Sequence, residues 1–339
     1  MPGSTLKTSF FHLSYHAKDN LEIMRNTSDL FKKIIPKINY SSKNIDKKKE
    51  KKKIKVGFVS EFLTSHTIGK LFGGLVKNID RNKFDVLVFH AQNTKKSIIK
   101  NEIDATSNKV INLKRKIKDQ HKQIENENLD IIFYPEIGMS PTIYFLAFSR
   151  LAPVQIVSWG HPETTGIGTI DYFLSSTLLE PSTKKKKYSE RLICLSQFPL
   201  YYEPPKNLGP LKSRKELQLP ENSRLYGCPQ SLFKLHPDFD SIIEKILIKD
   251  PESYIVFIGN DGKQKYWSEI LKKRWSSTIN KKVLFTKSLS LLEYISLCGC
   301  VDVLLDPLHF GGGNSFLESM LVGTPSITMP GTHLKTNIT

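Results

Sequence analysis

The sequence lacks long apolar runs. No stretch approaches the roughly 18 consecutive apolar residues of a membrane-spanning helix, and the N-terminus lacks the basic-then-apolar pattern of a secretory signal. Cysteines are few, four in 339 residues, and the spacing of Cys298 and Cys300 is too tight for the usual zinc-binding pattern. We therefore expect no membrane contact, reduced thiols and a cytoplasmic protein.

Acidic residues are scarce beside basic ones, 33 against 50, which gives a formal net charge of +17. Such a balance is typical of proteins that bind nucleic acid or another acidic partner. Much of the excess stands in two lysine runs, 47–55 and 184–187, and lysine is abundant throughout. We interpret it as solvated charge and expect a phosphate-bearing substrate, with nucleic acid the less favoured partner.

Short apolar runs alternate with segments of helical periodicity, which indicates an α/β fold with parallel sheets covered on both faces. The expected strands are 54–60, 84–90, 110–113, 129–134, 154–159, 171–174, 225–228, 254–258, 283–285, 301–305 and 326–329. The expected helices are 20–35, 68–76, 116–127, 142–149, 239–248, 266–275, 291–297 and 316–322.

The pattern lapses in a proline- and glycine-containing stretch between Tyr202 and Asn222, which we interpret as a domain boundary. We expect an attachment segment with a basic linker over 1–53, a first domain over 54–205 and a second over 222–339. Both domains should be doubly wound and Rossmann-like, facing a cleft lined by the carboxyl ends of their strands.

A glycine loop stands at the end of the expected strand 301–305. Asp306-Pro307 closes the strand, Gly311, Gly312 and Gly313 follow, and Asn314-Ser315 opens a helix that carries Glu318 one turn on. Glycines admit a ligand close to the backbone, and unpaired amides at a helix start attract phosphate. Ser315-x-x-Glu318 is also a capping box, which needs no ligand, and both interpretations stay open.

Other polar groups follow strand ends, where such folds keep their sites. His66 is a candidate general base or anchor, or simply a helix cap. His161 and Thr164 are candidates for binding a sugar or an acceptor, or belong to a structural turn. Lys234 is a candidate phosphate ligand, or a solvated lysine.

Four acidic residues have more ordinary explanations. Asp238-x-Asp240 resembles a metal-binding pair of some sugar transferases, but acidic residues also favour helix starts. We take the structural interpretation and expect no essential metal. Glu136 stands at a strand end, as Asp306 does, where each can cap or brace its loop.

Several stretches together resemble the catalytic region of the O-linked N-acetylglucosamine transferase / SPINDLY family in its bacterial form. They are 55–60 with His66, 152–155 continuing to 159–166, 229–234, and 306–325 with 329–331. Their order is that of the family, and the resemblance extends from about Phe10 to Thr339. No tetratricopeptide repeats, which precede this region in the family, are present; a repeat region is an expected partner.

The resemblance implies a GT-B fold and inverting, metal-independent transfer of a sugar, N-acetylglucosamine, from a UDP-sugar to serine or threonine hydroxyls of proteins, with no cofactor. His66 matches the family's active-site histidine, and Lys234 matches the lysine that binds the UDP diphosphate. The remaining UDP-sugar contacts are expected from Gln230, Ser231, the three glycines, Asn314, Ser315 and Glu318, the last on the ribose.

Departures from the family leave the sugar identity open. The animal enzymes have glutamine where Ser231 stands, tyrosine where Phe233 stands and aspartate where Glu318 stands; Tyr294 takes the place of a histidine near the nucleobase. The family's returning C-terminal helix would follow Thr339, so we expect the second domain to be incomplete.

Two alternatives remain from the residues alone. One keeps the fold and changes the reaction to a UDP-sugar epimerase, or to a transferase with a non-protein acceptor. The other is a non-catalytic basic protein that binds nucleic acid or partner proteins.

Overall fold

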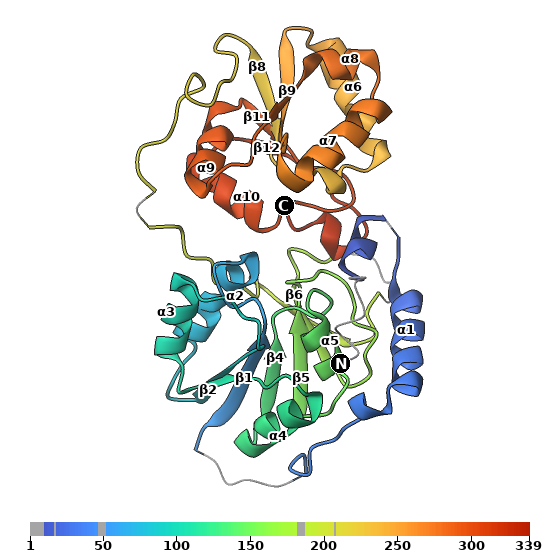
Figure 1. Ribbon diagram of the computed structural model, residues 1–339, viewed down its shortest axis with the longest axis vertical. Coiled ribbons are helices and arrows are strands. Elements are labelled where there is room, and N and C mark those ends of the chain that lie inside the picture. The colour runs from blue at the N-terminus through green and yellow to red at the C-terminus, as the bar shows by residue number, and fades with distance from the viewer. Residues whose placement is uncertain (1–9, 17, 47–51, 182–186, 207) are drawn as a thin grey trace. The chain divides into compact units, whose positions relative to one another are not determined.

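The computed structural model describes residues 10–16, 18–46, 52–181, 187–206 and 208–339 (Figure 1). The chain forms two compact units. Unit 1 holds the described residues up to Ser14 and those of Lys18–Glu203; unit 2 holds Tyr15, His16 and those of Pro204–Thr339. The predicted basic linker lies in part, at 47–51, outside the described residues, as do the lysines at 184–186.

Unit 1 is built on a seven-stranded parallel sheet in the order β3-β2-β1-β4-β5-β6-β7. The strands are β1 Ile54–Ser60, β2 Phe84–His90, β3 Lys109–Asn112, β4 Ile131–Tyr134, β5 Val154–Ser158, β6 Tyr172–Ser176 and β7 Arg191–Leu195. The helices are α1 Leu21–Ile34, α2 Thr67–Asn78, α3 Ile98–Thr106, α4 Ile117–Glu127 and α5 Pro141–Leu146. The near-continuous apolar character of the central strands suits burial on both faces.

Unit 2 repeats this plan with a five-stranded parallel sheet in the order β10-β9-β8-β11-β12. The strands are β8 Arg224–Cys228, β9 Ser253–Ile258, β10 Val283–Thr286, β11 Val303–Leu305 and β12 Ser326–Ile327. The helices are α6 Asp240–Lys249, α7 Gly262–Arg274, α8 Ser277–Lys282, α9 Leu291–Cys300 and α10 Asn314–Ser319. Both units are therefore doubly wound in the Rossmann manner, which confirms the predicted fold class.

Among the α-helices and β-strands, three were not predicted. Strand β7 has the apolar run 192–195 but lies at the sheet edge and is mostly exposed. Helix α3 buries only Ile103, and α8 has six residues, which are too few to show a period. Among the described residues, no helix is both long and apolar enough to cross a bilayer.

Helix α1 packs into unit 1, which the predicted attachment segment did not anticipate. The buried Phe31 ring lies 5.2 Å from the ring of Phe145 and 6.4 Å from that of Phe148. The loop before β6 closes on the same helix: a Cβ added at Gly166 would stand 2.3 Å from the carbonyl oxygen of Met24. The helix is therefore held both by side-chain packing of Phe31 and by a close backbone contact at Met24.

His121 gives the fold a predictable response to acid. The side chain is 3 % exposed, stacks on Tyr40 with ring centroids 4.5 Å apart, and lies 2.8 Å from Ser149 Oγ. Burial lowers the pKa of His121 to about 4, against a small opposing effect of Glu125. The unfolded chain therefore binds more protons between pH 6.5 and about 4, so stability falls as the pH drops through this window.

We expect the melting temperature to fall between pH 7 and pH 5, and to fall less in His121→Gln, whose side chain does not titrate. Thermal unfolding followed by circular dichroism at both pH values measures this. An equal decrease in the two proteins would contradict the assignment to His121.

Candidate functional site

The glycine loop of unit 2 joins β11 to α10. Gly313 is the N-cap of α10 and has a φ of +51°, a conformation that favours glycine. A Cβ at Gly312 would stand 3.0 Å from Nε2 of Gln230. The glycines therefore bring the backbone against the loop after β8, as the sequence predicts for a loop that admits a close neighbour.

A chain of hydrogen bonds links this loop to Lys234. The Lys234 Nζ donates to Oε1 of Gln230 at 3.0 Å, and Nε2 of Gln230 donates to Oγ of Ser315 at 2.7 Å. Ser315 Oγ donates to the carbonyl of Gly312 at 2.6 Å. Three residues predicted to bind the UDP-sugar, two that follow β8 and one that follows β11, thus meet at the carboxyl ends of these strands. The two strands lie side by side in the sheet.

Burial sets the charges of this site. The pKa of Lys234 is lowered to about 8 by loss of solvent, although the carboxylate of Asp306 works in the opposite direction. Burial raises the pKa of Asp306 to about 6, against hydrogen bonds from Thr339 and Thr328. Each ion lacks the full solvation it would have in water. An anionic ligand would therefore gain strongly from Lys234.

The capping-box interpretation of Ser315 and Glu318 is wrong. Gly313, not Ser315, is the N-cap, and no side chain caps that end. Ser315 lies within the first turn, so its hydroxyl is used for Gln230 and Gly312 instead. A true capping box stands at the start of α9, between Ser290 and Glu293.

Two further residues predicted to bind the UDP-sugar, Asn314 and Glu318, lie on α10 and are buried. Asn314 is 8 % exposed, and its Oδ1 has no hydrogen-bond partner among the described residues. A buried acceptor without a partner is costly unless a ligand satisfies it. Glu318 is 7 % exposed, and its charge, after burial, helps to raise the pKa of Cys298 to about 12. The hydroxyl of Tyr294, a residue of α9, donates to the carbonyl of Ser315 at 2.9 Å.

A small cavity of about 20 Å³ lies between the loop after β8, helix α9 and the glycine loop. Its lining residues include Gln230, Tyr294, Asp306, Gly312 and Ser315. This volume is about that of one water molecule, so a nucleotide-sized ligand would have to lie along its mouth or displace neighbouring groups. Ser231, the remaining predicted contact, is half-buried at the start of the 3₁₀ turn that ends in Lys234.

His66 is the N-cap of α2 in unit 1. Its Nδ1 accepts a hydrogen bond from the backbone N–H of Ile68 at 3.2 Å, and its ring lies 4.6 Å from that of Phe62. Burial, and then the charge of Lys70, lower its pKa, which favours the neutral imidazole. A neutral ring that accepts at Nδ1 carries its proton on Nε2, so it donates from that nitrogen. This geometry favours positioning over proton abstraction.

His161 and Thr164 belong to a buried turn of unit 1. His161 is 1 % exposed, with Nδ1 at 3.0 Å from the carbonyl of Ile137 and Nε2 at 3.2 Å from Ser14 Oγ. Thr164 Oγ1 donates to Glu190 Oε2 at 2.7 Å. These contacts are those of the structural turn, the alternative to a sugar or acceptor site; neither side chain presents a free group in this conformation.

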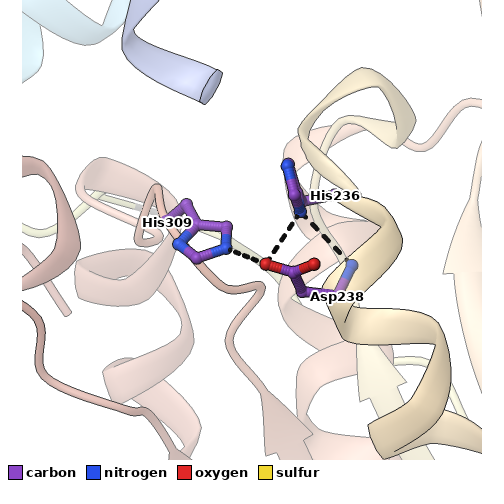
Figure 2. Close-up of side chains that lie close together, drawn as sticks. All are labelled: His236, Asp238 and His309. Atoms are coloured by element: carbon purple, nitrogen blue, oxygen red, sulfur yellow. Dashed lines mark hydrogen bonds and ion pairs between the residues drawn. The ribbon is translucent and has the colours of Figure 1, made fainter. Parts of the chain in front are cut away.

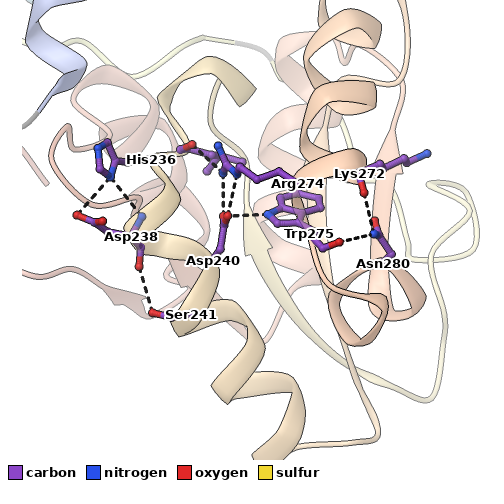
Figure 3. A network of polar contacts seen from close by, with 9 residues as sticks. His236, Asp238, Asp240, Ser241, Lys272, Arg274, Trp275 and Asn280 are labelled. Atoms are coloured by element: carbon purple, nitrogen blue, oxygen red, sulfur yellow. Dashed lines mark hydrogen bonds and ion pairs between the residues drawn. The ribbon is translucent and has the colours of Figure 1, made fainter.

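Two of the acidic residues singled out in the sequence, Glu136 at a strand end and Asp240 at a helix start, make structural contacts. Glu136 is fully buried and accepts from Ser60 Oγ at 2.8 Å, and burial raises its pKa well above the usual value. In unit 2, Asp240 accepts from Arg274 and from the indole of Trp275 at 2.9 Å (Figure 3). Its contacts brace the start of α6 and agree with the structural interpretation for Asp240.

Comparison with known proteins places the chain. Residues 14–200 match the family model of glycosyl transferase family 41. A probable UDP-N-acetylglucosamine–peptide N-acetylglucosaminyltransferase SPINDLY of Arabidopsis thaliana is 28% identical over 54% of this chain and 20% of its own length. A UDP-glucose:protein N-beta-glucosyltransferase of Actinobacillus pleuropneumoniae is 24% identical over 67% of this chain and 36% of its own. The chain thus spans about a fifth of the length of the SPINDLY relatives it matches.

The fold has a solved counterpart. An O-GlcNAc transferase mutant of Thermobaculum terrenum shares it with a TM-score of 0.81 at 18% identity, over 97% of this chain and 64% of that one. The likeness extends to unit 2, which lies beyond the family-model match, and it agrees with the predicted GT-B type. Since the family model covers more than half of the sequence, the chain belongs to glycosyltransferase family 41.

Proposed function

We propose that this chain provides the catalytic region of a UDP-sugar-dependent glycosyltransferase. It transfers N-acetylglucosamine to serine and threonine hydroxyls of proteins, with inversion and without a metal ion. Family membership and the SPINDLY relatives support the reaction class and donor. The observation that carries the proposal is the hydrogen-bonded group Lys234–Gln230–Ser315 at the glycine loop, beside the unpartnered Oδ1 of Asn314.

In the proposed reaction, the acceptor hydroxyl oxygen attacks the anomeric carbon while the bond from that carbon to the UDP oxygen breaks, and the hydroxyl proton passes to a phosphate oxygen of the departing UDP. Negative charge then collects on the departing diphosphate. The ammonium of Lys234 neutralises this charge from a fixed, poorly solvated position, and preorganised stabilisation of this kind is usually the largest catalytic contribution. The backbone of the glycine loop approaches the phosphates, and Asn314 Oδ1 accepts a hydrogen bond from a donor hydroxyl or amide.

A second candidate keeps the fold and changes both substrates: transfer of glucose from UDP-glucose to a protein nitrogen. The relative from Actinobacillus pleuropneumoniae is named for that reaction and matches two thirds of this chain. The departures at Ser231 and Phe233 stand where donor discrimination would be made.

Mass spectrometry distinguishes these reactions. The purified chain is incubated with lysate proteins and either UDP-N-acetylglucosamine or UDP-glucose, in the presence of EDTA. We expect an N-acetylhexosamine mass increment on serine or threonine. A hexose increment on asparagine would favour the second candidate, and conversion of the sugar nucleotide without any acceptor would indicate an epimerase. No increment with either donor would overturn both transferase assignments.

The role of His66 can be tested separately from its cap. Asparagine is among the best N-cap residues, so His66→Asn keeps the acceptor for the Ile68 N–H and removes the imidazole. We expect transfer to fall at least about tenfold, as for loss of a positioned proton donor, with an unchanged melting temperature. Unchanged transfer would reduce His66 to a helix cap.

A further inference from the structure

Three metal-ligating side chains of unit 2 converge beside the glycine loop (Figure 2). His236 and Asp238 stand at the start of the 3₁₀ turn Pro237–Phe239, and His309 precedes the three glycines. Asp238 Oδ2 lies 2.8 Å from Nε2 of His309 and 3.3 Å from Nδ1 of His236. The three ligand atoms all lie within 4.8 Å of one another.

Among the described residues of this cluster, one imidazole nitrogen and one carboxylate oxygen face each other without a positive group between them. His236 Nδ1 accepts from the backbone N–H of Asp238 at 3.2 Å, so its lone pair is directed towards that end of the residue. The same nitrogen also faces Asp238 Oδ2 at 3.3 Å. In the tautomer that accepts at Nδ1, two acceptor atoms oppose each other there. A cation bound to both would replace the 3.2 Å hydrogen bond at Nδ1 and turn this repulsion into attraction.

We propose that His236, Asp238 and His309 bind one Zn²⁺ ion, with water as the fourth ligand. Two imidazoles and one carboxylate form a ligand set that zinc accepts with an open position. Bond lengths near 2.0–2.1 Å in a tetrahedron place ligand atoms roughly 3.3 Å apart. The His236–Asp238 distance already has this value, and the His309–Asp238 distance of 2.8 Å would lengthen as the ion replaces the hydrogen bond. The side chains are accessible: the exposed fractions are 28 %, 58 % and 23 % in that order.

Such an ion would join two separate segments of unit 2. His236 stands two residues after Lys234, and His309 stands two residues before Gly311. The Lys234 ammonium already lies 4.7 Å from the ring of Phe310, the neighbour of His309. Zinc would therefore hold the Lys234 turn and the glycine loop together from outside the group that we assign to the diphosphate. It would have no part in the transfer reaction, which we propose to be metal-independent.

Two variants test the site while keeping the backbone conformation. His309 has a φ of +74°, a region that asparagine tolerates, and the shorter asparagine removes the Nε2 group that faces Asp238. His236 is an N-cap, where asparagine is equally suited. His236→Asn and His309→Asn therefore remove one imidazole each while keeping the local structure. His12→Asn, at an exposed histidine of unit 1, is the matched control.

The chain is stripped with a chelator, dialysed and titrated with ZnCl₂ in a calorimeter, and the titration is repeated with Co²⁺ to follow its visible absorption. We expect one equivalent to bind, with affinity at least about tenfold weaker in both cluster variants and unchanged in His12→Asn. Melting curves in EDTA should show that all four proteins are equally folded.

Binding without saturation at one equivalent would overturn the proposal, as would equal affinity in the wild type and both cluster variants. No sugar nucleotide is present in this measurement, so its result is independent of the proposed transferase activity. Transfer measured in EDTA tests that activity separately.

Discussion

Lys234→Ala is expected to lower the rate of sugar transfer by at least about a hundredfold, because it removes the ammonium that is hydrogen-bonded through Gln230 to the glycine loop. The chain should stay folded. A lysine whose pKa burial lowers to about 8 contributes little net stability, since its desolvation offsets its contacts. Initial rates of transfer to a fixed acceptor, with saturating UDP-sugar, measure the effect. The melting temperature reports on the fold.

Two variants make the result specific. Lys245→Ala removes an exposed lysine of the same unit and should leave the rate unchanged. Lys234→Arg keeps the charge but replaces a compact ammonium by a planar fork, so we expect partial loss. If Lys234→Ala turns over at a near-normal rate, Lys234 is not the group that stabilises the departing diphosphate.

Gly166→Ala is expected to destabilise unit 1 by several kcal/mol, on the order of 3 or more. A new Cβ would stand 2.3 Å from the carbonyl oxygen of Met24 and 2.8 Å from the backbone nitrogen of Arg25, and neither backbone atom can rotate away. Relief requires α1 or the loop to move. The free energy of unfolding from denaturant titration measures the loss.

Gly323→Ala separates this overlap from backbone strain. Gly166 and Gly323 both have a φ of +71°, but nothing lies within 4 Å of a Cβ at Gly323. Its alanine variant should therefore cost only about 1 kcal/mol, the penalty of a left-handed conformation. Equal destabilisation of the two variants would mean that strain, and not the contact with α1, determines the effect.

Much of the fold follows from local apolar pattern. The runs 54–60 and 84–90 coincide with β1 and β2 residue for residue, because buried parallel strands need apolar side chains on both faces. Pattern and structure differ where burial is slight. Strand β7 is apolar in sequence but mostly exposed, and of the predicted strand 326–329 only Ser326 and Ile327 pair as β12.

The candidate site was less accessible to prediction. Sequence patterns place the glycine loop and Lys234 at strand ends, but no pattern shows that Gln230 bridges Lys234 to Ser315. The capping-box motif misled because it fixes spacing and not where the helix begins; the positive φ of Gly313 moves the N-cap two residues earlier. The meeting of His236 with His309 depends on the pairing of β8 with β11, which joins distant parts of the chain.

The strand order also has a consequence for folding kinetics. Strand β1 in unit 1 and strand β8 in unit 2 each pair with a strand about 75 residues further along the chain. Val56 pairs with Ile131, and Tyr226 pairs with Val303. Closing these long loops costs chain entropy before the strand contacts can stabilise the fold. Proteins rich in such distant contacts therefore fold slowly. Until β4 pairs with β1, and β11 with β8, one edge of β1 and one edge of β8 stay unpaired and their apolar side chains stay exposed. Each unit therefore passes through a partly assembled sheet that is prone to aggregation, and refolding yield should fall as protein concentration rises.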